Sequence, residues 1–187
     1  MFFSKIFMAG AVMAATAAAT LTSVDIVADI KVLTQKSNAL YPTAQDITVV
    51  NAPLISVGQG PFPAINHGLG DIINTATVTV NALGGSPVIT VEADVQLVID
   101  AFRDFTDSYE GLLNILVVKA DLLHNNANIG LSVSALLRGL EHVVDTLSVG
   151  LVAVVGVEAQ VPALQVEVKA LVDLLTVCIG KFEAIAV

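Results

Sequence analysis

The sequence predicts an all-α fold, an antiparallel bundle of five helices with a long central helix, or of six if residues 44–54 form a helix of their own. In each segment apolar residues recur at alternating steps of three and four, which keeps them on one helical face. Between these segments lie short clusters of Gly, Pro and Asn. The single cysteine, Cys178, allows no internal disulfide, so helix packing must hold the fold together.

The longest apolar stripe predicts the central helix. Ser86-Pro87 is a typical helix start, because serine caps free backbone N–H groups and proline suits the first helical position. The stripe that follows consists of Val88, Val91, Val95, Val98, Phe102, Phe105, Tyr109, Leu112 and Leu116. We predict one helix from Pro87 to about Leu123, ended by the polar cluster at 124–128.

Two helices are predicted before it. Thr22 and Ser23 can cap the first, and Pro42 should stop or kink it near Tyr41. A short second piece follows at helical spacing, with Ala44, Ile47, Val50 and Leu54. After the turn at 58–63, a further helix carries the stripe Phe62, Ile65, Leu69, Ile72, Ala76, Val80 and Leu83. Gly84-Gly85 should end that helix, and the glycines inside it, Gly68 and Gly70, indicate close helix approach.

Two more helices follow the central one. The first carries Val133, Leu136, Leu137, Leu140, Val143, Val144, Leu147, Leu151 and Val154. The last begins near Pro162 and carries Leu164, Val168, Leu171, Leu175, Cys178, Phe182 and Ile185. The apolar run at 149–157 between them is too short to cross a bilayer.

The first nineteen residues have the features of a secretory signal peptide. Lys5 supplies a positive charge, residues 6–18 are small and apolar, and Ala17 to Ala19 suit signal peptidase. We expect cleavage near Ala19 and a secreted product, residues 20–187, that forms one helical domain. A retained membrane anchor is the alternative, and we expect no integral span in the mature chain.

Charge and composition limit the kinds of molecule that this protein is expected to bind. The chain has eight Lys and Arg against seventeen Asp and Glu, a formal net charge of −9, so a nucleic-acid partner is not expected. Its mean hydropathy is +0.82, and 55% of its residues are hydrophobic. A small domain cannot easily hide so many apolar side chains, so some should line a cavity or a surface patch.

No catalytic or metal-binding motif stands out. His67, His124 and His142 lack the spacing of a helix-borne zinc site, and no serine lies in a Gly-x-Ser-x-Gly elbow. Asp100, Asp104, Asp107 and Glu110 lie opposite the aromatic stripe, where a solvated helix face explains them better than a calcium site or a carboxylate pair. Cys178 lies on an apolar stripe as a buried, inert thiol. We therefore expect no enzyme, no metal and no cofactor.

Three segments resemble a known family. Residues 112–123 form an apolar run that closes on a lysine, residues 133–140 follow, and residues 162–172 form a proline-started last helix. In this order they resemble the fungal hydrophobic surface-binding protein A family, also called the cell-wall galactomannoprotein family, and the similarity extends over about 23–186. The chain departs from the family at Ala120-Asp121, where a proline is usual, and in its richness in valine.

The resemblance implies a secreted or wall-associated helical domain, without known catalysis, that holds fatty acids in an elongated cavity or adsorbs to hydrophobic surfaces. We therefore expect a fatty-acid or lipid-binding protein. The alternatives are a surface-active protein that coats hydrophobic surfaces and recruits hydrolases, and a secreted effector acting on a host protein. Ser37 and Tyr109 are the candidate donors to a polar head group, although a hydroxyl bonded to its own backbone is the alternative. The full candidate lining of the cavity is Ile30, Leu33, Ser37, Leu40, Phe62, Ile65, Leu69, Phe102, Phe105, Tyr109, Leu112, Leu116, Leu140, Leu171 and Leu175.

Overall fold

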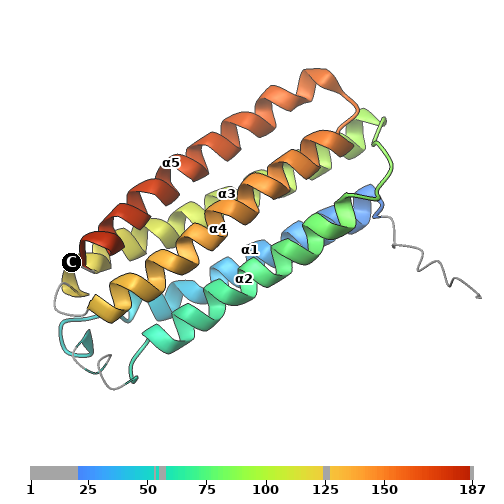
Figure 1. The fold of residues 1–187 in the computed structure, drawn as a ribbon. Coiled ribbons are helices and arrows are strands. Elements are labelled where there is room, and N and C mark those ends of the chain that lie inside the picture. Colours follow the sequence, from blue (N-terminus) through green and yellow to red (C-terminus); the bar gives the residue numbers. More distant parts are fainter. Residues whose placement is uncertain (1–20, 53, 55–57, 124–126, 186–187) are drawn as a thin grey trace, which may run out of the picture.

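The computed structural model describes residues 21–185 except 53, 55–57 and 124–126, and this part of the chain is an all-α bundle (Figure 1). The predicted signal peptide and His124 lie outside the described residues. Short 3-10 turns occupy Asp121–Leu123 and Glu158–Gln160. The α-helices are α1 (Ser23–Gln45), α2 (Phe62–Leu83), α3 (Glu92–Ala120), α4 (Ala127–Val154) and α5 (Val161–Ile185).

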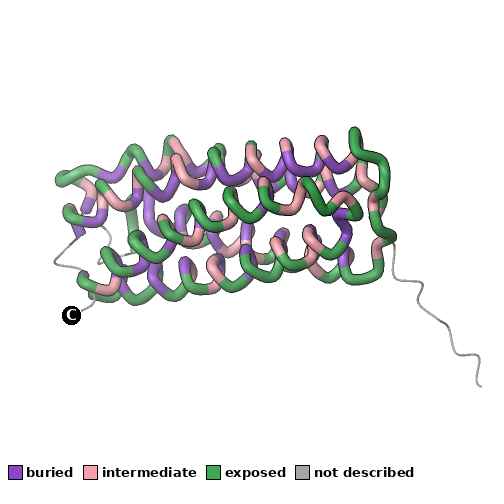
Figure 2. Tube along the Cα trace, turned by 90° about the horizontal axis from the view of Figure 1, so that it is seen from above, coloured by how far each residue is buried: buried purple, intermediate pink, exposed green. Residues whose placement is uncertain are grey.

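The helices form a closed ring rather than a simple row. Each packs mainly against two others, in the ring order α1, α3, α5, α4, α2. Five axes spaced about 9 Å apart in a regular ring lie about 8 Å from its centre, so the interior needs large side chains. Phe102, Phe105, Tyr109 and Phe182 are the largest fully buried ones, and Figure 2 shows buried positions recurring along every helix. The aromatic stripe of α3 therefore helps to fill the wide interior of the ring.

The first helix begins as predicted but continues past its proline. The Thr22 backbone N–H donates to Asp25 Oδ2 at 2.9 Å, and the Asp25 N–H donates to Thr22 Oγ1 at 3.3 Å, which makes a capping box. The predicted stop near Tyr41 is wrong, because α1 includes Pro42 and ends at Gln45. Pro42 lies in the last turn of α1, where few backbone hydrogen bonds of the helix remain to be formed. The Tyr41 hydroxyl holds this turn in place by donating a hydrogen bond to the Ser108 carbonyl of α3 at 2.5 Å.

The predicted short helix at 44–54 is also wrong. Its described residues beyond Gln45 form turns, in which Thr48 N–H donates to Asn51 Oδ1 at 2.8 Å and Asn51 Nδ2 donates to the Asp46 carbonyl at 2.6 Å. Such side-chain bonds to the backbone compete with helix formation. Val50, expected on a buried stripe, is 86% exposed. The part of the chain that the structure describes thus holds five α-helices, not six.

The central helix begins later than predicted. Ser86 accepts the Leu21 N–H and donates to the Ala82 carbonyl, each at 3.0 Å, so it caps no helix of its own. Residues 87–91 run across the end of the bundle, where Ile89 forms a parallel bridge with Val155. A Cβ on Gly156 would lie 2.8 Å from the Ile89 carbonyl oxygen, so this crossing requires glycine. Tertiary pairing of this loop delays the start of α3 to Glu92.

The second helix follows the sequence closely. It begins at Phe62, has Pro63 in its first turn and ends at Leu83 before Gly84. A Cβ on Gly68 would collide with the Leu40 side chain of α1, which confirms the predicted close approach there. The same expectation for Gly70 is wrong, because a Cβ on that residue would have no neighbour within 4 Å.

Candidate functional site

All of the candidate cavity residues lie in the interior. None of their side chains is more than 7% exposed, and their apolar members belong to one contiguous core that extends over all five helices. The pockets found among the described residues, reported below, are lined by other side chains. The stripes therefore correctly identify buried faces, and a role for these residues in ligand contact stays a prediction.

The two candidate polar donors differ from each other. Ser37 Oγ donates to the Leu33 carbonyl one turn back, at 3.0 Å, so its hydroxyl is already engaged. The Tyr109 hydroxyl is fully buried and has no hydrogen-bond partner among the described residues. Burial, together with the nearby Cys178, raises the pKa of Tyr109 well above its ordinary value, so its hydroxyl remains a neutral donor. Of the two, only Tyr109 has an unused polar atom.

Cys178 is the inert thiol that its position predicts. It is a free cysteine with no exposed surface, on the inner side of α5. Burial raises the pKa of its thiol to about 12. Since the thiolate is the reactive form, a nucleophilic role at neutral pH is disfavoured.

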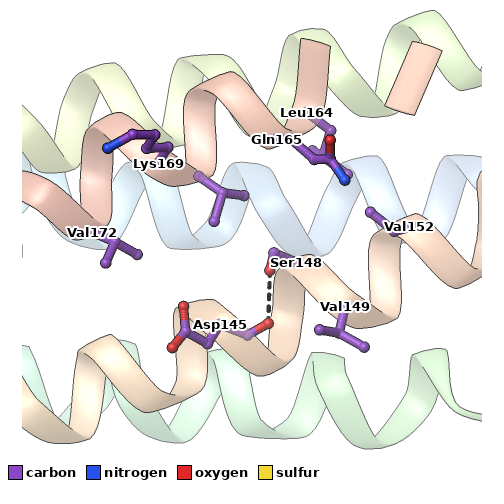
Figure 3. A pocket seen from close by; sticks show the side chains of 9 residues that line it. Asp145, Ser148, Val149, Val152, Leu164, Gln165, Lys169 and Val172 are labelled. Carbon is purple, nitrogen blue, oxygen red and sulfur yellow. Dashed lines mark hydrogen bonds between the residues drawn. The ribbon is translucent and has the colours of Figure 1, made fainter. Parts of the chain in front are cut away.

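A groove lies between α4 and α5. It has a volume of about 420 Å³ and is partly open to solvent. Figure 3 shows its labelled side chains coming from both helices, with Val149 and Val152 on α4 and Val172 on α5. We call it the α4–α5 groove. Its lining consists of Asp145, Ser148, Val149, Val152, Leu164, Gln165, Val168, Lys169 and Val172.

The groove combines aliphatic walls with a polar rim. Val149 is 69% exposed although it is apolar, whereas Leu164 is buried at the base. Ser148 Oγ donates to the Asp145 carbonyl at 2.7 Å, and Lys169 Nζ contacts Asp173 at 2.6 Å, so both polar groups bond within their own helix (Figure 3 shows the Ser148 bond). Among the described residues, no side-chain bond links α4 to α5 along this groove.

Sequence reasoning missed the groove because it assigned each helix one buried stripe. Val168 was placed on the buried stripe of the last helix but is only half-buried, and Val149 and Val172 lie outside the predicted stripes. The one available indication was the run at 149–157, which is apolar on every face. A helix that packs mainly against two neighbours cannot bury such a run on all sides.

The α4–α5 groove is the most spacious of the four pockets described for this molecule. A mainly apolar and more enclosed pocket of about 380 Å³ lies between α2 and α4, with Thr77, Asn81, His142 and Thr146 among its lining residues. Smaller ones lie beside Lys119 and around the loop at 87–91. The α4–α5 groove is therefore the best candidate site in the described part of the molecule.

The residues considered for catalysis or metal binding do not converge. His67 and His142 lie exposed on different helices, and the described residues contain no group of His, Cys, Asp or Glu that could hold a metal ion. Asp104 and Asp107 are exposed, while Arg103 binds Glu167 at 2.8 Å and Asp100 at 3.1 Å. This is the predicted solvated helix face. None of the described helices is long and apolar enough to span a membrane.

Comparison of the chain with protein-family models, curated proteins and solved structures finds no match. The side chains of the groove are therefore the guide to function. They provide a concave apolar surface with hydroxyl, amide and ammonium groups at its edge. That combination can hold a hydrocarbon chain and orient a polar end, as small-molecule sites commonly do.

Proposed function

We propose that this chain is a secreted, non-catalytic protein that binds fatty acids or similar amphiphiles and holds their acyl chains between its helices. It would act outside the cell or at a fungal cell wall, as the family resemblance implies. The observation that carries the proposal is the α4–α5 groove, an apolar depression that the fold leaves open despite its large apolar inventory.

The physical chemistry of the groove favours an acyl chain. Each CH₂ group removed from water contributes roughly 0.8 kcal/mol, with no need for directed bonds. The lining on α5 extends from Leu164 to Val172, about 12 Å along the axis at 1.5 Å per residue. A volume of about 420 Å³ lies within the ~300–1,000 Å³ typical of small-molecule sites.

The polar rim supports an amphiphile over a plain hydrocarbon. Lys169 and Gln165 stand beside the aliphatic wall, so an oxygen-bearing end can stay hydrated or hydrogen-bonded there. Lys169 already pairs with Asp173, and Asp145 adds a negative charge. The rim therefore tolerates several head groups, which supports a broad class of amphiphiles.

The test begins with the full-length coding sequence expressed in a fungal host. We expect the protein in the medium, with acyl lipids identified by mass spectrometry of its extract, and displacement of a fluorescent fatty acid from the α4–α5 groove. Absence of both co-purified lipid and displacement would reject the proposal.

A matched pair of variants places the site. Val149→Asp puts a carboxylate into the groove wall and should weaken fatty-acid binding by about tenfold or more, because an acyl chain would have to desolvate it. Val166→Asp makes the same change at a residue of α5 that is 67% exposed and lies outside the groove lining. It should leave affinity unchanged. Equal effects of both variants would remove the groove as the binding site.

A further inference from the structure

Tyr109 differs from the other buried hydroxyl groups. Of the described residues, Ser37, Thr79, Thr106, Ser108 and Ser134 are the buried ones with aliphatic hydroxyls, and each of them donates a hydrogen bond. Tyr109 makes none. An unsatisfied buried hydroxyl costs about 1–3 kcal/mol, so a residue of this kind favours any partner that brings an acceptor oxygen.

The surroundings of Tyr109 select the chemistry of that partner. Its ring packs against Phe105 with centroids 5.8 Å apart, and Cys178 of α5 lies close by. In the part of the chain that the structure describes, no Lys, Arg or His side chain is buried. An ionised carboxylate at Tyr109 would therefore lose its hydration without gaining a cation, which is costly. An uncharged oxygen carries no such penalty.

Resting on the proposed function, we propose that Tyr109 donates a hydrogen bond to an uncharged oxygen of the bound amphiphile. The ligand class is then a long-chain ester, alcohol or protonated acid, and an ionised fatty acid is held less well at this position. Tyr109 is thus a selectivity-determining residue for the head group, inside the ring of helices.

Helix α5 is the element that separates the groove from Tyr109. Val172 lines the groove, while Leu171, Leu175 and Cys178 of the same helix are buried in the core. Cys178 lies six residues beyond Val172, about 9 Å along the axis. A bound amphiphile can reach Tyr109 only if α5 moves outward from α3 and α4, its two main neighbours in the ring.

The experiment compares two variants on three ligands of equal chain length. Tyr109→Phe removes the donor and keeps the ring, and Ser134→Ala is the control, because the buried Ser134 hydroxyl donates to the Leu131 carbonyl of its own helix and lies outside the candidate cavity lining. The probes are methyl palmitate, hexadecane and, at alkaline pH, palmitate, each measured by displacement of a fluorescent fatty acid. The apo stability of each variant is measured by urea unfolding.

We expect Tyr109→Phe to weaken methyl palmitate binding by about three- to tenfold and to leave hexadecane binding unchanged, since one neutral hydrogen bond is lost. Ser134→Ala should change neither. Without ligand, Tyr109→Phe should be at least as stable as the wild type. The inference is overturned if Tyr109→Phe binds the ester as tightly as the wild type, or if ionised palmitate binds the wild type more tightly than the ester does.

The two proposals fail in different ways. If the wild type binds none of the three probes, the proposed function itself is rejected before any variant is compared. If the wild type binds all three and Tyr109→Phe behaves as Ser134→Ala does, amphiphile binding stands and the role of Tyr109 is rejected.

Discussion

Two interfaces between neighbouring helices of the ring, the α1–α3 seam and the α4–α5 seam, are built in opposite ways. Between α1 and α3, Ser108 Oγ bonds Asn38 Oδ1 at 2.8 Å, and Lys119 Nζ bonds the carbonyls of Gln45 and Ile47 at 3.0 and 2.7 Å. The Tyr41 ring occupies the space that Gly111 leaves free. Between α4 and α5, polar links such as Arg138 with Glu183 lie beyond the groove.

The difference follows from the connections of the helices. Helices α1 and α3 are separated by a whole helix in sequence, so only their mutual contacts fix their relative position. Helices α4 and α5 are joined by a short connection through residues 155–160, which holds one end of the pair together. Their seam can therefore remain partly open along the groove. The tight α1–α3 interface thus specifies the fold, whereas the tethered α4–α5 interface leaves a groove open.

The largest expected effect concerns Cys178, on the buried side of α5. In the ligand-free protein Cys178 stays protonated, because burial raises the pKa of its thiol from 9.0 to about 12. At mildly alkaline pH this lowers the thiolate fraction about a thousandfold relative to an unshifted thiol, and the reaction with a thiol reagent slows at least as much. Rates measured in the folded and urea-unfolded protein test this. Similar rates in both states would mean that α5 is loose on both sides.

Adding a methyl group to the tight seam should be costly. In Gly111→Ala the new Cβ would collide with the Tyr41 ring and force it off the Ser108 carbonyl. We expect a loss of about 1–3 kcal/mol in the free energy of unfolding, measured in urea. Gly180→Ala on α5 is the control, because its Cβ would have no neighbour within 4 Å, and it should stabilise by about 0.5–1 kcal/mol. A harmless Gly111→Ala would show that this seam is not tight.

Adding volume to the open seam should be tolerated. Ser148→Leu places an apolar side chain in the groove and replaces a hydroxyl that bonds only its own helix. We expect the free energy of unfolding to stay within about 1 kcal/mol of the wild type or to rise, because apolar surface is buried and leucine favours helix. Fatty-acid displacement should be lost. A strongly destabilised variant would mean that the groove is closed in solution.

The smallest effect concerns like charges beside α5. Burial, followed by the charges of Asp107 and Glu167, raises the pKa of Glu110 above its usual value. The folded state therefore prefers protonated Glu110, so the wild type is penalised at neutral pH and relieved as the pH falls through the raised pKa. Glu110→Gln should stabilise by about 0.5 kcal/mol or less at neutral pH, with the gain vanishing in acid. Urea unfolding at several pH values measures it. A gain independent of pH would point to packing instead.

Prediction from the sequence worked best for local structure. The helix cap at Thr22 and the end of α2 at Gly84 depend on residues only a few positions apart, and both were predicted. The apolar stripes identified the core, including Tyr109 and Cys178, because periodicity fixes which face of a helix is apolar.

Prediction failed where distant segments compete with a local preference. Ser86-Pro87 has a helix-start pattern, yet Ser86 bonds Leu21 and the loop after it pairs with Val155. Pro42 has a helix-stop pattern, yet the contact of Tyr41 with α3 keeps the last turn of α1 in place. In each case a contact remote in sequence outweighed a local preference, about 1 kcal/mol for the serine cap and up to about 3 kcal/mol for proline inside a helix.

The sequence by itself determined that this protein is built of amphipathic helices and which side chains they bury, because these properties depend on near neighbours along the chain. Only the tertiary structure decided the ring order of the helices, the open seam between α4 and α5, and the unpaired state of the Tyr109 hydroxyl. All three depend on which helices lie side by side. The apolar stripes in the sequence do not specify which helices become neighbours, because every stripe is apolar and can pack against any other.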